Sequence, residues 1–231
     1  MRLDAYLVGI GHFKSRGRAK SAILAGSVKV NGVVVTKVSR DVAYGDEIEV
    51  AAGLDMPQGY FKLKKIQEES KILQPGDRVL DIGSSAGGFI LFASEIAGHI
   101  KGIEFSRDFR SELGKIAYER KNVEIMFGDI FTVPLHELSE EPVDVILSDI
   151  TLEPEDSVKI LERVLPLLKN EGKILQVLKT PQKKNPKPLL SKIKSLGVEI
   201  LQVISSEKKQ EIYVIARKSA LFPEEVKPSH D

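Results

Sequence analysis

Residues 81–89 read Asp81-Ile82-Gly83-Ser84-Ser85-Ala86-Gly87-Gly88-Phe89, and this stretch decides the fold. It follows the apolar run 79–82 and precedes a segment with helical spacing of its apolar residues. Glycines at such a turn let the backbone approach a ligand without a Cβ in the way. The helix behind the turn adds free N–H groups at its first residues. A strand, a glycine-rich turn and a helix in this order predict a Rossmann-like α/β domain with a ligand site at the turn.

Further apolar runs extend this unit toward the C-terminus. Helical stretches separate the first five strand candidates, which predicts a parallel sheet. The last two are joined by a short polar turn, so they must pair antiparallel. We therefore expect an α/β fold with a mostly parallel seven-stranded sheet that contains one antiparallel strand. The seven predicted strands are 79–82, 100–103, 123–126, 143–147, 174–178, 198–204 and 211–217.

The first 50 residues predict a separate small α+β module. One short helix begins near Arg2, and a second begins after Ser15, a plausible N-cap, and ends at Gly26. Strands 28–30 and 33–35 flank Asn31-Gly32, a strong hairpin signal, and 46–50 forms a third strand. The expected domain boundaries are a module at 1–50, a linker at 51–59, a second domain at 60–218 and a loose tail at 219–231.

The net charge of +1 hides an asymmetry along the chain. Residues 1–40 hold eight basic residues and one acid, Asp4, which gives +7, so the remaining residues sum to −6. A basic end on an otherwise acidic protein indicates a polyanionic partner, and few aromatic residues accompany it. We expect the module to contact RNA phosphates rather than to stack on single-stranded bases. The predicted RNA-binding residues are Arg2, Arg16, Arg18, Lys20 and Lys29, with a second cluster at Lys183, Lys184 and Lys187 that either grips RNA or is a solvated loop.

Composition excludes several classes of protein. The chain has no cysteine, so it has no disulfide, thiolate metal site or cysteine nucleophile. The histidines at 12, 99, 136 and 230 lack ligand spacing, so no metal is expected. No apolar run approaches the roughly 18 residues that span a bilayer, and a signal peptide is not indicated. We expect a cytoplasmic protein without a membrane contact.

The glycine-rich turn predicts a nucleoside-containing cofactor. Glu104 ends the next strand and can accept hydrogen bonds from both hydroxyls of a ribose, while Asp129 could bind an adenine amine. The glycine spacing does not fit the Gly-x-Gly-x-x-Gly pattern of NAD enzymes. An acid directly before the turn suits the cationic S-adenosylmethionine, although a nucleotide or a degenerate site stays open. The predicted cofactor residues are Asp81, Gly83, Ser84, Ser85, Gly87, Gly88, Phe89, Glu104, Asp129 and Asp149.

Four ionisable residues are predicted to meet beside this cofactor. Asp149 and Lys179 end the fourth and fifth strands, Glu211 begins the antiparallel strand, and Lys62 precedes the first strand. Ligands in open α/β sheets bind at the carboxyl edge of the strands, where these residues would lie. A lysine can act as general base toward a ribose hydroxyl when burial or a second cation lowers its pKa. Lys179 is the candidate base, with Lys62 as the second cation, whereas the alternative is four solvated surface charges.

The chain now resembles two known families. Residues 1–50 resemble the S4 RNA-binding domain through Arg2-Leu3-Asp4, Ser15 to Lys20 and Gly26 to Gly32. Residues 60–218 resemble the FtsJ-type (RrmJ-like) RNA methyltransferases through Phe61-Lys62-Leu63, the 81–89 turn, Ser148-Asp149 and the 211–216 strand. The two in this order are similar to the TlyA family, ribosomal RNA 2′-O-methyltransferases once described as hemolysins.

The resemblance implies a Lys-Asp-Lys-Glu tetrad at Lys62, Asp149, Lys179 and Glu211. It also implies S-adenosylmethionine as cofactor, ribosomal RNA or a ribosomal subunit as partner, and methylation of a ribose 2′-hydroxyl. Two alternatives remain: a non-catalytic RNA-binding or ribosome-assembly factor with a vestigial cofactor pocket, and a membrane-active hemolysin-like protein. The lack of an apolar span or a strongly amphipathic basic helix argues against the latter.

Overall fold

The computed structural model describes residues 1–50, 56–179, 185–206 and 210–220. The chain divides into two compact units, Met1–Gln58 and Gly59–Asp231, and each is described by itself. Of the predicted segments, most of the linker and nearly all of the C-terminal tail lie outside the described residues.

The first unit is the predicted α+β module. Its sheet has the order β2-β1-β3 with both pairs antiparallel. Buried apolar residues of both helices and of the sheet form one core, to which Ala19, Ala22 and Ile23 contribute one face of the second helix. The elements are α1 (Leu3–Gly9), α2 (Arg16–Leu24), β1 (Val28–Val30), β2 (Val33–Val34) and β3 (Ile48–Val50).

Local signals in this unit act as their chemistry predicts. The Ser15 hydroxyl accepts a hydrogen bond from the Arg18 backbone N–H at 3.3 Å and caps α2. Asn31 and Gly32 both have positive φ, 52° and 77°, as the tight hairpin turn requires. The third strand begins at Ile48 rather than at residue 46, because the Asp46 carboxylate is engaged in the turn by Asn31 and by the Ala43 N–H.

The buried Asp4 ties the two helices of the module together. Its carboxylate accepts hydrogen bonds from Arg2 Nε at 3.0 Å and from Arg16 Nη2 at 2.8 Å. The bonds from Arg2 and then from Arg16 lower the pKa of Asp4 to about 2. Both arginines stay more than half exposed, so they can still meet an RNA phosphate, but part of their donor capacity holds the fold.

We expect Asp4→Asn to destabilise the module by about 2 kcal/mol, since hydrogen bonds to charged partners carry about that much. The low pKa of Asp4 means that its contribution is present above its unfolded value of 3.8 and is lost as the pH falls toward 2. Hydrogen exchange of α1 and α2 in the full chain measures the effect. Asp41→Asn is the control, because the Asp41 side chain is exposed and lies 3.9 Å from the N-terminal amine. Equal exchange in both variants would contradict the assignment.

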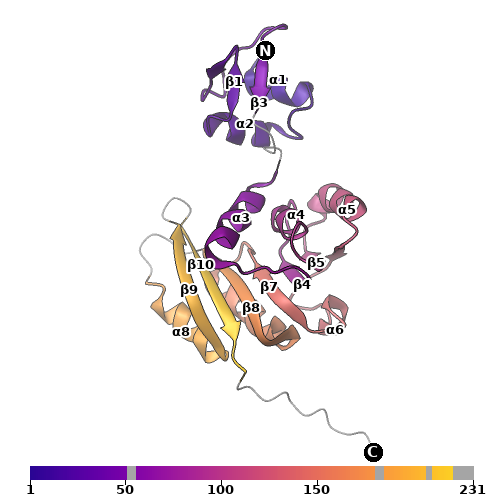
Figure 1. The fold of residues 1–231 in the computed structure, drawn as a ribbon, viewed down its shortest axis with the longest axis vertical. Helices are drawn as coiled ribbons and strands as arrows, with labels where there is room; N and C mark the ends of the chain where they lie inside the picture. The colour runs from indigo at the N-terminus through magenta and orange to yellow at the C-terminus, as the bar shows by residue number, and fades with distance from the viewer. Residues whose placement is uncertain (51–55, 180–184, 207–209, 221–231) are drawn as a thin grey trace, which may run out of the picture. The chain divides into compact units, whose positions relative to one another are not determined.

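The second unit is a seven-stranded sheet between helices (Figure 1). The strand order is β6-β5-β4-β7-β8-β10-β9, and only β10 runs against its neighbours. The predicted fold class is therefore confirmed. The strands are β4 (Arg78–Ile82), β5 (His99–Glu104), β6 (Val123–Phe127), β7 (Val143–Ser148), β8 (Leu168–Lys179), β9 (Val198–Ser206) and β10 (Glu211–Lys218).

Helices cover both faces of this sheet and form two apolar cores. One core lies against α3, α4 and α5, and the other lies against α6, α7 and α8. The helices are α3 (Gln58–Ser70), α4 (Gly88–Ala93), α5 (Arg110–Glu119), α6 (Leu135–Leu138), α7 (Pro154–Val164) and α8 (Lys187–Ser195), with short 3-10 turns at Arg107–Phe109 and Leu165–Leu167.

One strand is much longer than predicted. The apolar pattern predicts residues 174–178, whereas β8 begins at Leu168. Its added part is polar, and Glu171 has a φ of 62° where the pairing with β7 shifts register. Polar residues in this irregular start conceal the strand from a search for apolar runs. Within the described residues, no helix has the length and apolar character needed to cross a bilayer.

Candidate functional site

The topology gathers the predicted catalytic residues at one edge of the sheet. β7 and β8 run parallel, so Asp149, directly after β7, and Lys179, the last residue of β8, lie at their carboxyl ends. Glu211 begins β10 and is the direct cross-strand partner of Lys179. Lys62 reaches the same point from α3, which precedes the first strand.

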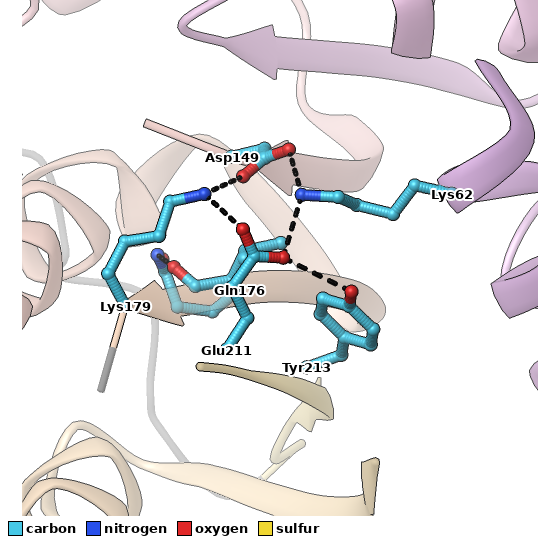
Figure 2. A network of polar contacts seen from close by, with 7 residues as sticks. Lys62, Asp149, Gln176, Lys179, Glu211 and Tyr213 are labelled. Atoms are coloured by element: carbon cyan, nitrogen blue, oxygen red, sulfur yellow. Dashed lines mark hydrogen bonds and ion pairs between the residues drawn. The ribbon is translucent and has the colours of Figure 1, made fainter. Parts of the chain in front are cut away.

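The four side chains form a closed ring of ion pairs (Figure 2). Lys62 Nζ lies 2.6 Å from Asp149 Oδ2 and 3.0 Å from Glu211 Oε2. Lys179 Nζ lies 3.3 Å from Asp149 Oδ1 and 2.5 Å from Glu211 Oε1. Each amine thus contacts both acids, and the two positive charges balance the two negative ones.

Burial distinguishes the four members of this ring. The side chains of Lys62 and Glu211 are 8% and 7% exposed, whereas those of Asp149 and Lys179 are 19% and 33% exposed. Burial alone would raise the pKa of Glu211, but hydrogen bonds from Lys179 and Lys62 outweigh it and lower the pKa. Glu211 therefore stays ionised and keeps both amines in place, while Lys179 is the member most accessible to a substrate.

Close helix packing directs Lys62 toward the ring. A Cβ built on Gly88 would lie 2.7 Å from the Gly59 Cα, so the close approach of the α3 and α4 backbones requires glycine at position 88, and a Cβ on Gly59 would be tight at 3.3 Å. This approach fixes α3 against α4 one turn from Lys62. The structure thus gives Gly88 a packing function, and its predicted contact with a cofactor stays a prediction.

Tyr213 is a member of the site that sequence reasoning missed. Its hydroxyl donates to Glu211 Oε2 at 3.1 Å, and its ring centroid lies 5.6 Å from Lys62 Nζ. Figure 2 shows the Tyr213 side chain beside Glu211. The buried Gln176 lies on the neighbouring strand β8. The sequence does contain a signal for Tyr213: residues two apart on a strand point to the same face, and Tyr213 follows Glu211 by two.

A cavity of about 520 Å³ adjoins this ring of charges. Asp149 belongs to both, since it lines the cavity and contacts both lysines. Five predicted cofactor residues line the cavity, and the sequence analysis missed its apolar walls. The lining consists of Gly83, Ser85, Ile103, Glu104, Phe105, Phe109, Gly128, Asp129, Ile130, Phe131, Asp149, Ile150, Thr151 and Leu152.

Backbone donors fix two further acids that line this cavity. Glu104 accepts hydrogen bonds from the Ser85 and Ser106 N–H groups, both at 2.7 Å. Asp129 Oδ1 accepts one from the Phe131 N–H at 2.9 Å. Carboxylate oxygens have further lone pairs, so both acids can still bind hydroxyl or amine donors. These geometries suit the ribose and adenine contacts predicted for them.

Asp81 is the most perturbed acid of the site. Its side chain is buried, and within the described residues its Oδ2 has no hydrogen-bond partner. The pKa of Asp81 is raised to about 7, mainly by burial; a hydrogen bond from Ser84 opposes the rise, and the nearby charges of Asp149 and Glu104 add to it. A buried carboxyl group whose Oδ2 has no partner favours a cationic ligand nearby. This agrees with the predicted S-adenosylmethionine.

The remaining predicted cofactor residues build the turn and do not line the cavity. Gly87 has a φ of 76° and caps α4, and a Cβ there would lie 2.3 Å from the Ile116 side chain. Phe89 belongs to the core under α3 and α4, and Ser84 is buried. Direct contact of these residues with a cofactor stays a prediction.

The predicted RNA-binding residues have mixed surroundings. Lys20 is exposed and Arg18 is half-buried on α2, and Lys29 pairs with Glu49 across β1 and β3 at 3.0 Å. Lys183 and Lys184 lie outside the described residues. Lys187 was expected in a loop but is the first residue of α8, because Pro186 and Pro188 are tolerated at a helix start. Among the described residues, no cluster of His, Asp or Glu has metal-site geometry.

Comparison with known proteins adds two family matches. The FtsJ-like methyltransferase family model matches residues 56–219, and the S4 domain model matches residues 1–48. Hemolysin A of Brachyspira hyodysenteriae is 41% identical over 90 residues, which cover 38% of each chain. Ribosomal RNA large subunit methyltransferase E of Syntrophobacter fumaroxidans is 36% identical over 97 residues, which cover 41% of this chain and 47% of the relative.

The matches to these two curated relatives span less than half of their length. Among solved structures, fibrillarin of Aeropyrum pernix in complex with natively bound S-adenosyl-L-methionine superposes with a TM-score of 0.56. It is 24% identical and covers 63% of this chain and 68% of its own. This likeness supports the fold of the second unit.

Proposed function

Since the chain belongs to the FtsJ-like methyltransferase family, we propose that it transfers a methyl group from S-adenosylmethionine to a ribose 2′-hydroxyl of RNA. The observation that carries this proposal is the position of Asp149. It lines the cavity and contacts both amines of the ion-pair ring. Donor site and acceptor site would therefore meet at one carboxylate.

The cavity fits the proposed cofactor in its chemistry. Glu104 and Asp129 offer acceptors for a ribose and an adenine amine, and apolar walls suit a purine. Asp81 is not part of the lining, but it places a buried acid near the end of β4, two residues before the lining residue Gly83, where it would favour a positive charge. The fibrillarin with a similar fold contains S-adenosyl-L-methionine, which supports the same cofactor here. When bound, S-adenosylmethionine would supply an activated methyl group.

The residues of the ring would handle the acceptor. Lys179, the most exposed member, would first release its own proton to solvent and, as a neutral amine, would then accept the proton of the ribose hydroxyl as that oxygen attacks. Asp149 and Glu211 would hold the resulting ammonium through contacts that already exist at 3.3 and 2.5 Å. Lys62, fixed by the same two acids, would keep a second positive charge beside the reacting oxygen. The main contribution is alignment, since the methyl donor is already reactive.

Transfer of label from methyl-labelled S-adenosylmethionine to total RNA tests the proposal. A methyl group on a 2′-hydroxyl blocks alkaline cleavage of the adjoining phosphodiester, so the label should appear in alkali-resistant dinucleotides. Label on base nitrogens would overturn the 2′-O assignment. If calorimetry detects no binding of S-adenosylmethionine, the alternative of a non-catalytic assembly factor gains support instead.

Ribosomal RNA in the cytoplasm is the substrate class we propose. The relative from Syntrophobacter fumaroxidans is named as a ribosomal RNA methyltransferase, and the S4 domain match supplies an RNA-binding module. Mass-spectrometric mapping of ribose methylation in cells that lack the protein would identify the target. Loss of methylation from a transfer RNA alone would contradict the ribosomal assignment.

Salt dependence tests the RNA contact of the first unit. The double variant Arg18→Ala and Lys20→Ala should weaken RNA binding about tenfold and reduce the slope of log affinity against log salt by about 2, one unit for each lost phosphate contact. Filter binding at several salt concentrations measures both. Lys169→Ala is the control, since Lys169 pairs with Asp144 near the start of β8, away from the carboxyl edge. An unchanged slope in the double variant would remove α2 from the RNA interface.

A further inference from the structure

The segment 129–133 forms one wall of the cavity. Asp129, Ile130 and Phe131 all line it. The segment begins with a tight turn, in which the Thr132 and Val133 N–H groups both donate to the Asp129 carbonyl at 3.0 and 2.9 Å. The carbonyls of Phe131 and Val133 point toward α7, where both accept hydrogen bonds from one side chain.

That partner is Arg163 on α7. Its Nε donates to the Phe131 carbonyl at 3.2 Å, and its Nη2 donates to the Val133 carbonyl at 2.5 Å. The planar guanidinium fork thus bridges two carbonyls of the same segment, although Arg163 lies 30 residues after Val133 in the chain. A rigid helix on the sheet thereby fixes the shape of a short irregular segment.

The hydrogen bonds of Arg163 go to this segment. Arg163 is absent from the cavity lining, so it does not touch a ligand there. Within the described residues, Arg163 has no carboxylate partner, and its buried Nη1 has no hydrogen bond. Its Nε and Nη2 donate to two carbonyls of segment 129–133, which sets Arg163 apart from an arginine that merely neutralises an acid.

We propose that Arg163 is a positioning residue for the cofactor, because it holds segment 129–133 in the shape that presents Asp129 and Ile130 to the cavity. This inference rests on the proposed function, since it takes the cavity as the S-adenosylmethionine site. Asp129 faces the adenosine half in that site, so the effect of Arg163 falls on binding of adenosine-containing ligands. It does not fall on the methyl-transfer step at the ion-pair ring.

Two substitutions of Arg163 separate positioning from charge. Arg163→Met removes both hydrogen bonds, and Arg163→Lys keeps the charge with a single point donor. Lys159→Met is the matched control, because Lys159 lies one turn earlier on α7, is exposed and pairs with Asp156 at 2.8 Å. Calorimetry with S-adenosylmethionine and S-adenosylhomocysteine gives the dissociation constants of the full-length variants, and initial rates give KM for the cofactor and kcat.

We expect Arg163→Met to raise Kd about tenfold, the order of effect of a misplaced binding group. The factor should be equal for both ligands, because they share the adenosine half. Arg163→Lys should lie in between, and kcat at saturating cofactor should stay within about twofold. A merely structural role would lower the active fraction, hence kcat, and leave KM unchanged. That result, or unchanged Kd in Arg163→Met, overturns the proposal.

Hydrogen exchange without ligand keeps the test decisive if the methionine variant folds poorly. In Arg163→Lys, the amides of residues 131–133 should exchange faster than in the unsubstituted protein, while those of α7 keep their protection. If exchange changes by the same factor in the segment and in α7, the inference is overturned. Absence of cofactor binding in the unsubstituted protein is a different outcome, because it overturns the proposed function and this inference with it.

Discussion

Replacing Lys179 by alanine should slow methyl transfer by about three orders of magnitude, within the range that a positioned general base contributes. The amine lies 2.5 Å from Glu211 and 3.3 Å from Asp149, and Lys179 is the most exposed of the four members of the ring. Cofactor affinity should stay within about threefold, because Lys179 does not line the cavity. Single-turnover rates and calorimetry measure the two quantities separately.

Lys173→Ala is the matched control for this prediction. Lys173 lies six residues earlier on the same strand, and its amine donates to the Lys71 carbonyl, away from the ring. Its loss should change the transfer rate by less than about twofold. A Lys179→Ala enzyme that retains the full rate would remove Lys179 from the chemistry. A variant that loses rate and cofactor affinity together would assign Lys179 to the cofactor site instead.

The ring of charges could be predicted because each member has a defined place in the topology. Asp149, Lys179 and Glu211 lie at strand ends, and the alternation of parallel and antiparallel strands sends those ends to one edge. The position of Lys62 was harder to predict, since Lys62 lies on a helix and no strand register fixes it. The position of Lys62 depends on the close backbone contact between Gly59 and Gly88, and no sequence pattern at either glycine predicts that contact.

The walls of the cavity could not be predicted in the same way. Phe105 and Phe131 follow strands in irregular segments, where no period of two or 3.6 tells which way a side chain points. Arg163 lies on a helix whose sequence predicts only an exposed charge. Its importance comes from two carbonyls in a segment 30 residues away, and such long-range hydrogen bonds leave no local pattern.

Asp81→Asn is expected to strengthen the fold and weaken cofactor binding at the same time. A pKa raised from 3.8 to about 7 means that the ionised Asp81 costs the folded protein up to about 4 kcal/mol. The cost is absent near pH 4, grows as the pH rises and is complete above pH 7. Asparagine avoids it, so the gain in the free energy of unfolding should follow the same pH dependence. Urea denaturation from pH 4 to 8 measures it.

Cofactor binding should show the opposite effect, because a cationic ligand needs the ionised acid. In the unsubstituted protein, affinity for S-adenosylmethionine should fall about tenfold per pH unit below pH 7, where Asp81 takes up its proton. Asp81→Asn should weaken binding about a hundredfold at pH 8, the order expected when a buried charge loses its partner. Its affinity should then vary little between pH 5 and 7. A variant that binds as tightly as the parent, or that keeps the parent's pH dependence, would show that another group receives the positive charge. The opposed signs matter, because a mutation that simply damaged the fold would lower stability and affinity together.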